Sequence, residues 1–220
     1  MKNIFLFILV IVAFKVSGQN HYIGLKGGVS STNIASTDVF SDSEARLGLS
    51  AGLTYEYLSN KHLSFGADLI YNQRGFTIET PFTDSQGNLT GDSYISIFEY
   101  DYVSVPIKVG FNIGTVLYGF ANIGVVPSLL LDAKHTVPIY FEEGKFVENK
   151  TLDVTDTVSK FDFAGLVEIG GGYKISMRTS LFTSLSYQHS FTSITNSSYF
   201  ANNNIRHIGI NFITGLKFAL

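Results

Sequence analysis

The sequence predicts an all-β protein, an eight-stranded antiparallel transmembrane up-and-down β-barrel with a polar interior. Three observations favour it. Apolar side chains recur at every second position through most of the chain, which is the period of a strand. The segments between these runs alternate between short and long. Only 15% of the 220 residues are charged, against roughly 25% in a typical soluble domain, so the surface is poorly suited to water.

The composition excludes several classes of protein. The chain contains no cysteine, which removes disulfide scaffolds, thiolate metal sites and cysteine nucleophiles. Its formal net charge of -3 argues against a partner that is a nucleic acid. No pattern predicts a cofactor, and the acidic segments lack the spacing of a calcium-binding loop.

The first residues are predicted to be a secretory signal peptide, residues 1–18, followed by the barrel domain, residues 19–220. Lys2 supplies a positive start, and residues 4–14 form a continuous apolar run. This run is shorter than the roughly 20 residues that a membrane-spanning helix needs. Small and medium residues precede the expected cleavage point after Gly18, to within a residue or two. The alternative is a buried N-terminal helix.

Eight strands are expected after the signal peptide, each with room for the roughly 9–11 residues that a tilted membrane strand needs. They lie near residues 22–30, 45–58, 62–76, 94–111, 116–131, 160–175, 179–191 and 205–220. In the last of these, Ile208, Ile210 and Phe212 alternate with small or polar residues, and Ile213 is the exception. The pattern of 116–131 is strand-like but does not show which set faces inward.

Each of the other segments has one large apolar face. In the first four the apolar positions are Ile23, Leu25 and Val29; Leu47, Leu49, Leu53, Tyr55 and Tyr57; Leu63, Phe65, Leu69 and Tyr71; and Val103, Val105, Ile107, Val109 and Phe111. In the last three they are Phe161, Phe163, Val167, Ile169, Tyr173 and Ile175; Leu181, Leu185 and Tyr187; and Ile208, Ile210, Phe212, Leu216 and Phe218. The alternate positions are mostly Gly, Ser, Ala and Asn with few charges.

The connections alternate strictly in length. Residues 59–61, 112–115 and 176–178 are expected to be short turns, and 31–44, 77–93, 132–159 and 192–204 long loops. Outer-membrane barrels have short periplasmic turns and long external loops. An even number of strands also places both termini on the periplasmic side. We therefore expect the protein in the outer membrane of a bacterial cell.

Alternation alone does not say which face lies inside. A soluble lipocalin-like barrel buries the apolar set, whereas a membrane barrel turns it toward lipid. A water-facing set would carry many more Lys and Glu than the polar set does here. Aromatic residues of the apolar set gather near both ends of the strands, as at the two membrane interfaces: Tyr55, Tyr57, Phe111, Tyr173 and Phe218 at one end, Tyr71 and Tyr187 at the other. We predict a membrane barrel, with an OmpX/OmpA-like architecture.

Charged residues of the polar set are expected to point into the barrel. They are Lys26, Glu56, Asp68, Arg74, Lys108, Glu168, Lys174 and Lys217. Charges in a confined interior must pair or be hydrated, because desolvation costs several kcal/mol per ion. An eight-stranded barrel is just wide enough for side chains, so we expect an ion-pair network that fills it. A conducting or ligand-binding lumen is the alternative.

Several segments resemble the PorT-like outer-membrane β-barrel family of Bacteroidetes. They are residues 24–33, which begin GLKGG, 69–76 (LIYNQRGF), 102–111 (YVSVPIKVGF), 119–131, 162–175 and 205–218. Pro106 and Lys108 stand where that family has them, but Ser104 replaces a frequent glutamate. The resemblance implies an outer-membrane location, and some members of the family assist protein secretion.

We expect a protein without enzymatic activity, acting as a structural, adhesion or secretion and assembly accessory protein through its external loops. His189 and Ser190 are adjacent on a strand and point to opposite faces, so they cannot form a catalytic dyad together; His207 with another serine is an alternative, as in a barrel protease or lipid hydrolase. A narrow porin-like transport barrel is the other alternative. The expected partners are the outer-membrane bilayer and another envelope protein.

Overall fold

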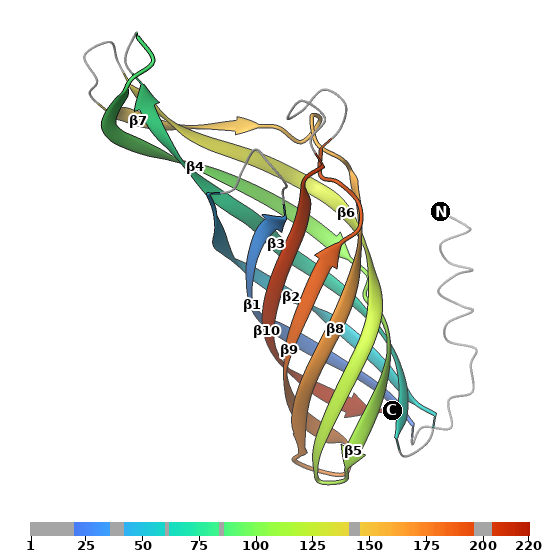
Figure 1. Cartoon of the computed structure of the whole chain (residues 1–220). Helices are drawn as coiled ribbons and strands as arrows, with labels where there is room; N and C mark the ends of the chain where they lie inside the picture. Colours follow the sequence, from blue (N-terminus) through green and yellow to red (C-terminus); the bar gives the residue numbers. More distant parts are fainter. Residues whose placement is uncertain (1–19, 36–41, 60–61, 84–85, 141–145, 196–203) are drawn as a thin grey trace.

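Strands account for nearly all of the chain that this computed structural model describes, residues 20–35, 42–59, 62–83, 86–140, 146–195 and 204–220. They wrap around one axis (Figure 1). Their bounds are β1 (His21–Ala35), β2 (Ser43–Leu58), β3 (Leu63–Thr83), β4 (Leu89–Ser104), β5 (Ile107–Gly114), β6 (Leu117–Tyr140), β7 (Phe146–Asp153), β8 (Phe161–Lys174), β9 (Thr179–Ser190) and β10 (Arg206–Ala219). The described residues include no helix that is long and apolar enough to cross a membrane. The predicted signal peptide lies outside them.

The sheet closes on itself, and its wall has eight positions. Around the barrel the order is β1, β2, β3, β4 with β5, β6, β8, β9 and β10. The first and last strands complete the circle, pairing antiparallel from Tyr22 with Ala219 to Ala35 with Arg206. A closed sheet leaves no edge in its wall, which is what hydrocarbon demands of a backbone. The predicted fold class is confirmed.

A proline interrupts one of the predicted strands. Residues 94–111 were expected to form a single strand, but β4 ends at Ser104 and β5 begins at Ile107. Pro106 has no N–H to give to a ladder. The neighbouring groups still bond across the break: Val105 N donates to Pro127 O and Asp68 N to Pro106 O, both at 2.9 Å. Because β4 and β5 lie end to end between β3 and β6, they share one position in the wall.

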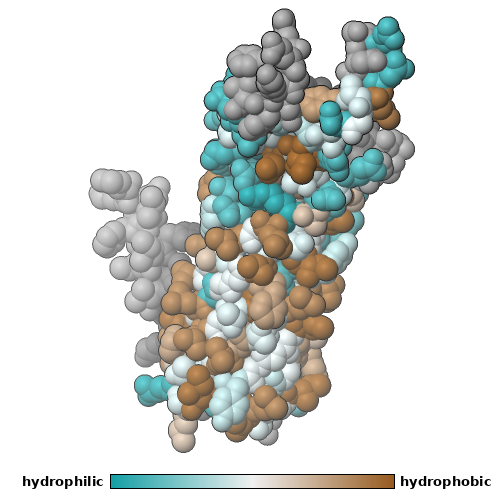
Figure 2. Space-filling view, turned by 90° about the vertical axis from the view of Figure 1, so that its left-hand side faces the viewer, coloured by the Kyte–Doolittle hydropathy of each residue, from teal (hydrophilic) through white to brown (hydrophobic). Residues whose placement is uncertain are grey.

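The apolar set faces outward along the whole wall. Leu53, Val167 and Leu185 are 52%, 55% and 47% exposed, whereas Ser50 and Ser184 are buried. Figure 2 shows the apolar residues as a broad brown belt over the lower part of the visible face, with hydrophilic residues gathered above it. In 116–131, where the sequence left the direction open, Ile123, Val125 and Leu129 point out and Phe120, Val126 and Ser128 point in.

The prediction of a long loop is wrong for two segments, 77–93 and 132–159, because strands continue into both of them. β3 and β4 pair as far as Thr83 with Leu89, within the predicted loop 77–93. β6 runs to Tyr140 and pairs with β7, within the predicted loop 132–159. We call these extensions, residues 76–83, 89–98, 134–140 and 146–153, the outer sheet. It leans away from the barrel at the upper left of Figure 1.

Ring contacts explain why the outer sheet forms. Phe76 and Phe98 stack at 4.6 Å, and the next ring along that row, His135, stacks on Phe98 at 4.0 Å. Farther out, Phe82 and Tyr94 lie 5.1 Å apart. Cross-strand aromatic pairs of this kind stabilise antiparallel strands by roughly 0.2–1 kcal/mol each.

Because the apolar set faces outward, a charged side chain introduced on the outer face should destabilise the protein most where that face is deepest in the membrane. Leu185 lies midway along β9, with exposed Ile169 and Phe212 opposite it on the two neighbouring strands. Leu185→Arg should lower the free energy of unfolding in lipid by roughly 2–4 kcal/mol, because arginine would face hydrocarbon. Urea titration of the protein in bilayers measures this. Met177→Arg in a turn, where the side chain is 99% exposed, should change little; equal costs at both positions would contradict the orientation.

Candidate functional site: the barrel interior

Four charged side chains from four strands form a chain of ion pairs across the lumen. Asp68 of β3 accepts from two lysines: Lys26 of β1, with Nζ 2.5 Å from Oδ2, and Lys108 of β5, at 2.8 Å. Lys108 also reaches Glu168 of β8, with Nζ 3.1 Å from Oε2. All four side chains are almost fully removed from solvent. Two bases therefore balance two acids in the middle of the barrel.

Neutral donors complete the coordination of both carboxylates. Thr54 Oγ1 donates to Asp68 Oδ1 at 2.6 Å. Asn122 Nδ2 donates to Glu168 Oε2 at 2.7 Å, and Ser184 Oγ to Oε1 at 2.8 Å. A buried ion pair is tolerable only when the remaining lone pairs also find donors. Every carboxylate oxygen here has at least one, so the network can hold its charges without bulk water.

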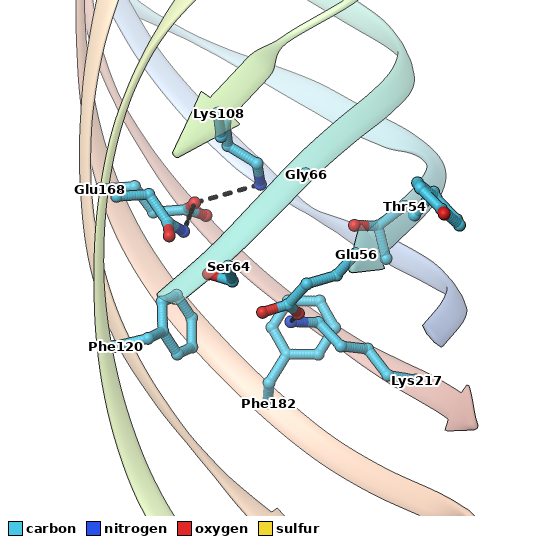
Figure 3. Close-up of a pocket in the computed structure, with 11 residues that line it drawn as sticks. Thr54, Glu56, Ser64, Gly66, Lys108, Phe120, Glu168, Phe182 and Lys217 are labelled. Atoms are coloured by element: carbon cyan, nitrogen blue, oxygen red, sulfur yellow. Dashed lines mark hydrogen bonds and ion pairs between the residues drawn. The ribbon is translucent and has the colours of Figure 1, made fainter. Parts of the chain in front are cut away.

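A second pair lies toward the short turns. Lys217 of β10 pairs with Glu56 of β2, and its Nζ lies 4.6 Å from the ring centre of Phe182 and 5.3 Å from that of Phe120. Figure 3 shows these groups converging below Lys108 and Glu168. A glycine provides the space for one of the rings, because a Cβ on Gly170 would lie 2.3 Å from the Phe120 ring.

A third pair lies toward the outer end and includes a residue that we did not predict. Arg74 Nη1 is 2.5 Å from Asp162 Oδ2, and Arg74 Nη2 donates to Ser128 Oγ at 3.0 Å. Asp162 also accepts from Ser190 at 2.9 Å and from Thr192 at 2.8 Å. The sequence could have predicted this residue. Asp162 lies an even number of residues from Glu168 on the same strand, so both side chains point to the same face.

Seven of the eight charged residues predicted to face inward take part in these pairs. The eighth, Lys174, lies at the inner mouth, where it lines an open cavity of about 570 Å³ with Glu56 and Lys217. Among the described residues it forms no ion pair. Of the predicted aromatic girdle, Tyr55, Tyr71, Phe111, Tyr173, Tyr187 and Phe218 are exposed on the outside, and Tyr57 is half-buried beside His21, with ring centres 4.8 Å apart.

The outer end of the lumen is apolar, which corrects the expectation of a polar interior for this end alone. Its buried residues are Ile34, Phe76, Phe98, Tyr100, Tyr102, Leu130, Ala133, Val154, Val158, Ile194 and Ile205, which we call the outer apolar cluster. Val158 bridges to Thr195, so segments that follow β7 and β9 pack together at this end. Packing of these apolar side chains closes the lumen at this end.

The cavities inside the wall are small. One of about 20 Å³ lies between Lys108 and Lys217, and another of about 20 Å³ between Lys26 and Asn211. A third, of about 10 Å³, adjoins Arg74 and His207. Each has room for about one water molecule. Side chains therefore fill most of the lumen around these ion pairs, between the open inner mouth and the outer apolar cluster.

The histidines do not assemble a nucleophilic site among the described residues. Ser190 donates to Asp162, while His189 faces the other way and contacts the Tyr187 hydroxyl at 3.2 Å. His207 is buried beneath the rings of Tyr100 and Tyr102, 5.1 and 5.8 Å away. Neither of its ring nitrogens has a hydrogen-bond partner in the described residues, so no serine is activated there. No group of three potential metal ligands occurs in that part of the chain.

The comparisons with known proteins agree with this geometry. The model of the family described as outer membrane protein beta-barrel domain matches residues 18–196. No curated protein matches the sequence.

Solved structures with a similar course of the chain are remote in sequence. Neisserial surface protein A (NspA) is 12% identical with a TM-score of 0.47, over 91% of this chain and 97% of its own. OprG from Pseudomonas aeruginosa is 11% identical with a TM-score of 0.46, over 92% and 97%. The outer membrane protease OmpT from Escherichia coli is 8% identical with a TM-score of 0.47, over 93% and 98%. At these sequence identities and TM-scores, none of the three structures bears on the activity of this chain.

The central ion-pair chain predicts a charge-balance rule. Lys108→Met should lower the free energy of unfolding by roughly 3–5 kcal/mol, because Glu168 would be left buried without its base. Lys108→Met combined with Glu168→Gln should recover a large part of that loss, since the remaining Lys26 and Asp68 balance. Lys134→Met, at an exposed pair with Asp132, serves as control and should change the stability little, because solvent screens an exposed pair. Urea unfolding in bilayers measures all four proteins, and a double variant no more stable than the single one would contradict the network.

Proposed function

The chain belongs to the outer membrane protein β-barrel domain family, and from this we propose that it is a closed, non-catalytic barrel that anchors a contact surface outside the cell. The bilayer of the outer membrane is its solvent, and the outer sheet is the part that meets other proteins. The observation that carries the proposal is the filling of the lumen by three groups of ion pairs and by the outer apolar cluster.

A filled lumen argues against the alternative of a narrow transport barrel. A solute would have to displace the Lys217–Glu56 pair, the four-charge chain and then Arg74 with Asp162. Past these it would meet the outer apolar cluster. Breaking a buried pair without replacing it costs roughly 3–5 kcal/mol, and the path contains at least three.

The outer sheet has the properties of a contact surface. It projects beyond the barrel (Figure 1), and it carries exposed apolar side chains. Leu89 and Ile95 of β4 are 69% and 58% exposed, and Leu152 of β7 is also exposed. By the strand register Ile95 and Leu152 lie on opposite faces of the sheet, because Leu152 is opposite His135, which is opposite Phe98. Both faces of the outer sheet therefore offer exposed apolar side chains to a partner. An adhesion or assembly-accessory role follows from a surface of this kind held on a rigid anchor.

The finer resemblance to PorT-like proteins is part of the same proposal. It supports an envelope role without naming a partner. Where that family often has glutamate, Ser104 bonds Ser128 and Asn72, both at 2.8 Å. Arg74, which lies against this serine pair, takes its carboxylate from Asp162 instead. The polar groups around Ser104 are thus satisfied without that glutamate, so the resemblance supports a shared scaffold rather than a shared activity.

The proposal predicts that the protein does not conduct. Purified protein in a planar bilayer should give no large, steady conductance, because side chains fill the lumen from the Lys217–Glu56 pair to the outer apolar cluster. A porin reconstituted in the same lipid provides the positive control. Steady channels in the wild-type protein would overturn the closed-barrel proposal and favour the transport alternative.

Removing the distal part of the outer sheet should reduce attachment while leaving the barrel folded. A trimmed variant joins β3 to β4 just beyond the pair Ile78–Ser96 and β6 to β7 just beyond Thr136–Thr151. It should keep the shift in gel mobility on boiling that marks a folded barrel. In a laboratory strain without adhesins of its own, cells carrying the trimmed variant should attach less to a protein-coated surface, or to one another, than cells carrying the wild type. Equal attachment would contradict the assigned surface.

A further inference from the structure

The two edges of the outer sheet differ in how they are protected. On the β3 edge, pairing with β2 ends at Ile78, and Pro81 follows, a residue that blocks further strand pairing. The opposite edge is β7, which among the described residues pairs only with β6. Its sequence, FVENKTLD, contains no proline. In Figure 1 the gold strand β7 borders the projecting sheet. An open edge of this kind is a template for another strand.

The register shows which backbone groups of β7 are free. Val154 N donates to Ala133 O at 2.9 Å, so that pair is hydrogen-bonded. Bonded and non-bonded pairs alternate along an antiparallel ladder, which makes Lys150 bonded to β6 and leaves Asn149 and Thr151 with N–H and C=O groups directed outward. Pro138 lies opposite Asn149, in a non-bonded pair, where its missing N–H is not needed.

Two opposite charges flank the centre of this edge. Glu148 and Lys150 are exposed and, two residues apart, lie on one face of the strand. On β6 the residues opposite them are the apolar Ile139 and Val137. In a single copy neither charge forms an ion pair with any described residue. A partner strand that places the opposite charge beside each of them would satisfy both.

We propose that β7 pairs antiparallel with β7 of a second copy of this chain, with Asn149 opposite Asn149 of that copy. The inference rests on the proposed role of the outer sheet as a contact surface and names its partner. In this register Glu148 lies opposite Lys150 of the second copy, and the symmetry repeats the pair. Both are non-bonded pairs, in which side chains approach most closely.

The neighbouring registers are less favourable. The two strands can also slide past each other to the next alignment in which their outward backbone groups still bond. That alignment sets Lys150 opposite Lys150, and like charges directly opposite each other destabilise a sheet. The next shift sets Lys150 opposite Leu152 and leaves Glu148 without a basic partner. Only the register centred on Asn149 pairs both charges. The strand is therefore complementary to itself in one alignment.

The membrane makes this pairing attainable. Two copies in one bilayer have the same end outward, so their two-fold axis runs along the membrane normal. Two antiparallel strands that are related by this axis must run perpendicular to it. In Figure 1, β7 runs across the long direction of the barrel. The pairing supplies on the order of six backbone hydrogen bonds. Confinement of both copies to one surface raises their effective concentration.

Cysteine cross-linking tests the register, since the chain has no cysteine of its own. Asn149→Cys in the full chain, reconstituted in bilayers and treated with a mild oxidant, should give a disulfide-linked dimer. Its Cα lies about 5.5 Å from its equivalent in a bonded pair, within disulfide range. Thr151→Cys on the same edge is the matched control. It would lie roughly 14 Å from its equivalent and should remain monomeric.

Charge exchange provides a second readout that does not depend on disulfide geometry. Adding Glu148→Lys to Asn149→Cys should reduce the cross-linked fraction several-fold at low salt. Adding Lys150→Glu as well should restore it, because the pairs are then exchanged rather than removed. Gel mobility before and after boiling verifies that each variant is folded.

Three results would overturn the proposal: no dimer with Asn149→Cys, equal cross-linking of Asn149→Cys and Thr151→Cys, or no response to charge reversal. The attachment assay with the trimmed variant separates this failure from failure of the proposed function. If trimming still reduces attachment, the outer sheet binds a partner other than a second copy.

Discussion

The constraint on which the whole structure depends is that a backbone in hydrocarbon must satisfy its own hydrogen bonds. A sheet meets that constraint only by closing, and here closure rests on the long antiparallel pairing of β1 with β10. Once the sheet is closed, strand alternation sorts every side chain to lipid or to lumen. The break at Pro106 is tolerated because Val105 N and Pro106 O still find partners on the flanking strands.

Closure with eight wall positions determines what the interior can hold. The lumen is only as wide as its side chains, so any charge placed there must find its partner among the other side chains that point inward. Lys108 shows the consequence: it contacts acids on β3 and β8, and so connects strands that are three positions apart in the wall. The same narrowness explains Gly170, which leaves room for the Phe120 ring. Side chains packed in this way hold the strands of the wall to one another through the lumen as well as through the backbone.

The wall could be predicted from the sequence because alternation is a local property of each strand. It identified the outward set, and it made Ile213 an exception that the structure places inside. Asp162 could have been added by the same parity. The partners within the lumen could not be predicted, since they depend on the register between strands that are distant along the chain. Lys26, for example, meets Asp68 rather than Glu56, although both acids are predicted to point inward.

The outer sheet was missed for a different reason. Residues 77–83 and 89–95 alternate weakly, with Thr, Glu and Ser among few large side chains, so the pattern there resembles that of a loop. Their pairing depends on the ring stack of Phe76, Phe98 and His135, whose members come from three strands. Strand length beyond a membrane is thus a tertiary property, whereas strand length inside one is set by the bilayer.

The central claim is that apolar side chains of the wall face acyl chains, and fluorescence quenching tests it most directly. The chain contains no tryptophan, so Val167→Trp and Leu152→Trp each introduce a single reporter, the first on the wall and the second on the outer sheet. In bilayers whose acyl chains carry bromine near their centre, fluorescence of the first should be strongly quenched and that of the second unchanged. Equal, weak quenching of both would contradict the account, because Val167 would then not lie in contact with lipid.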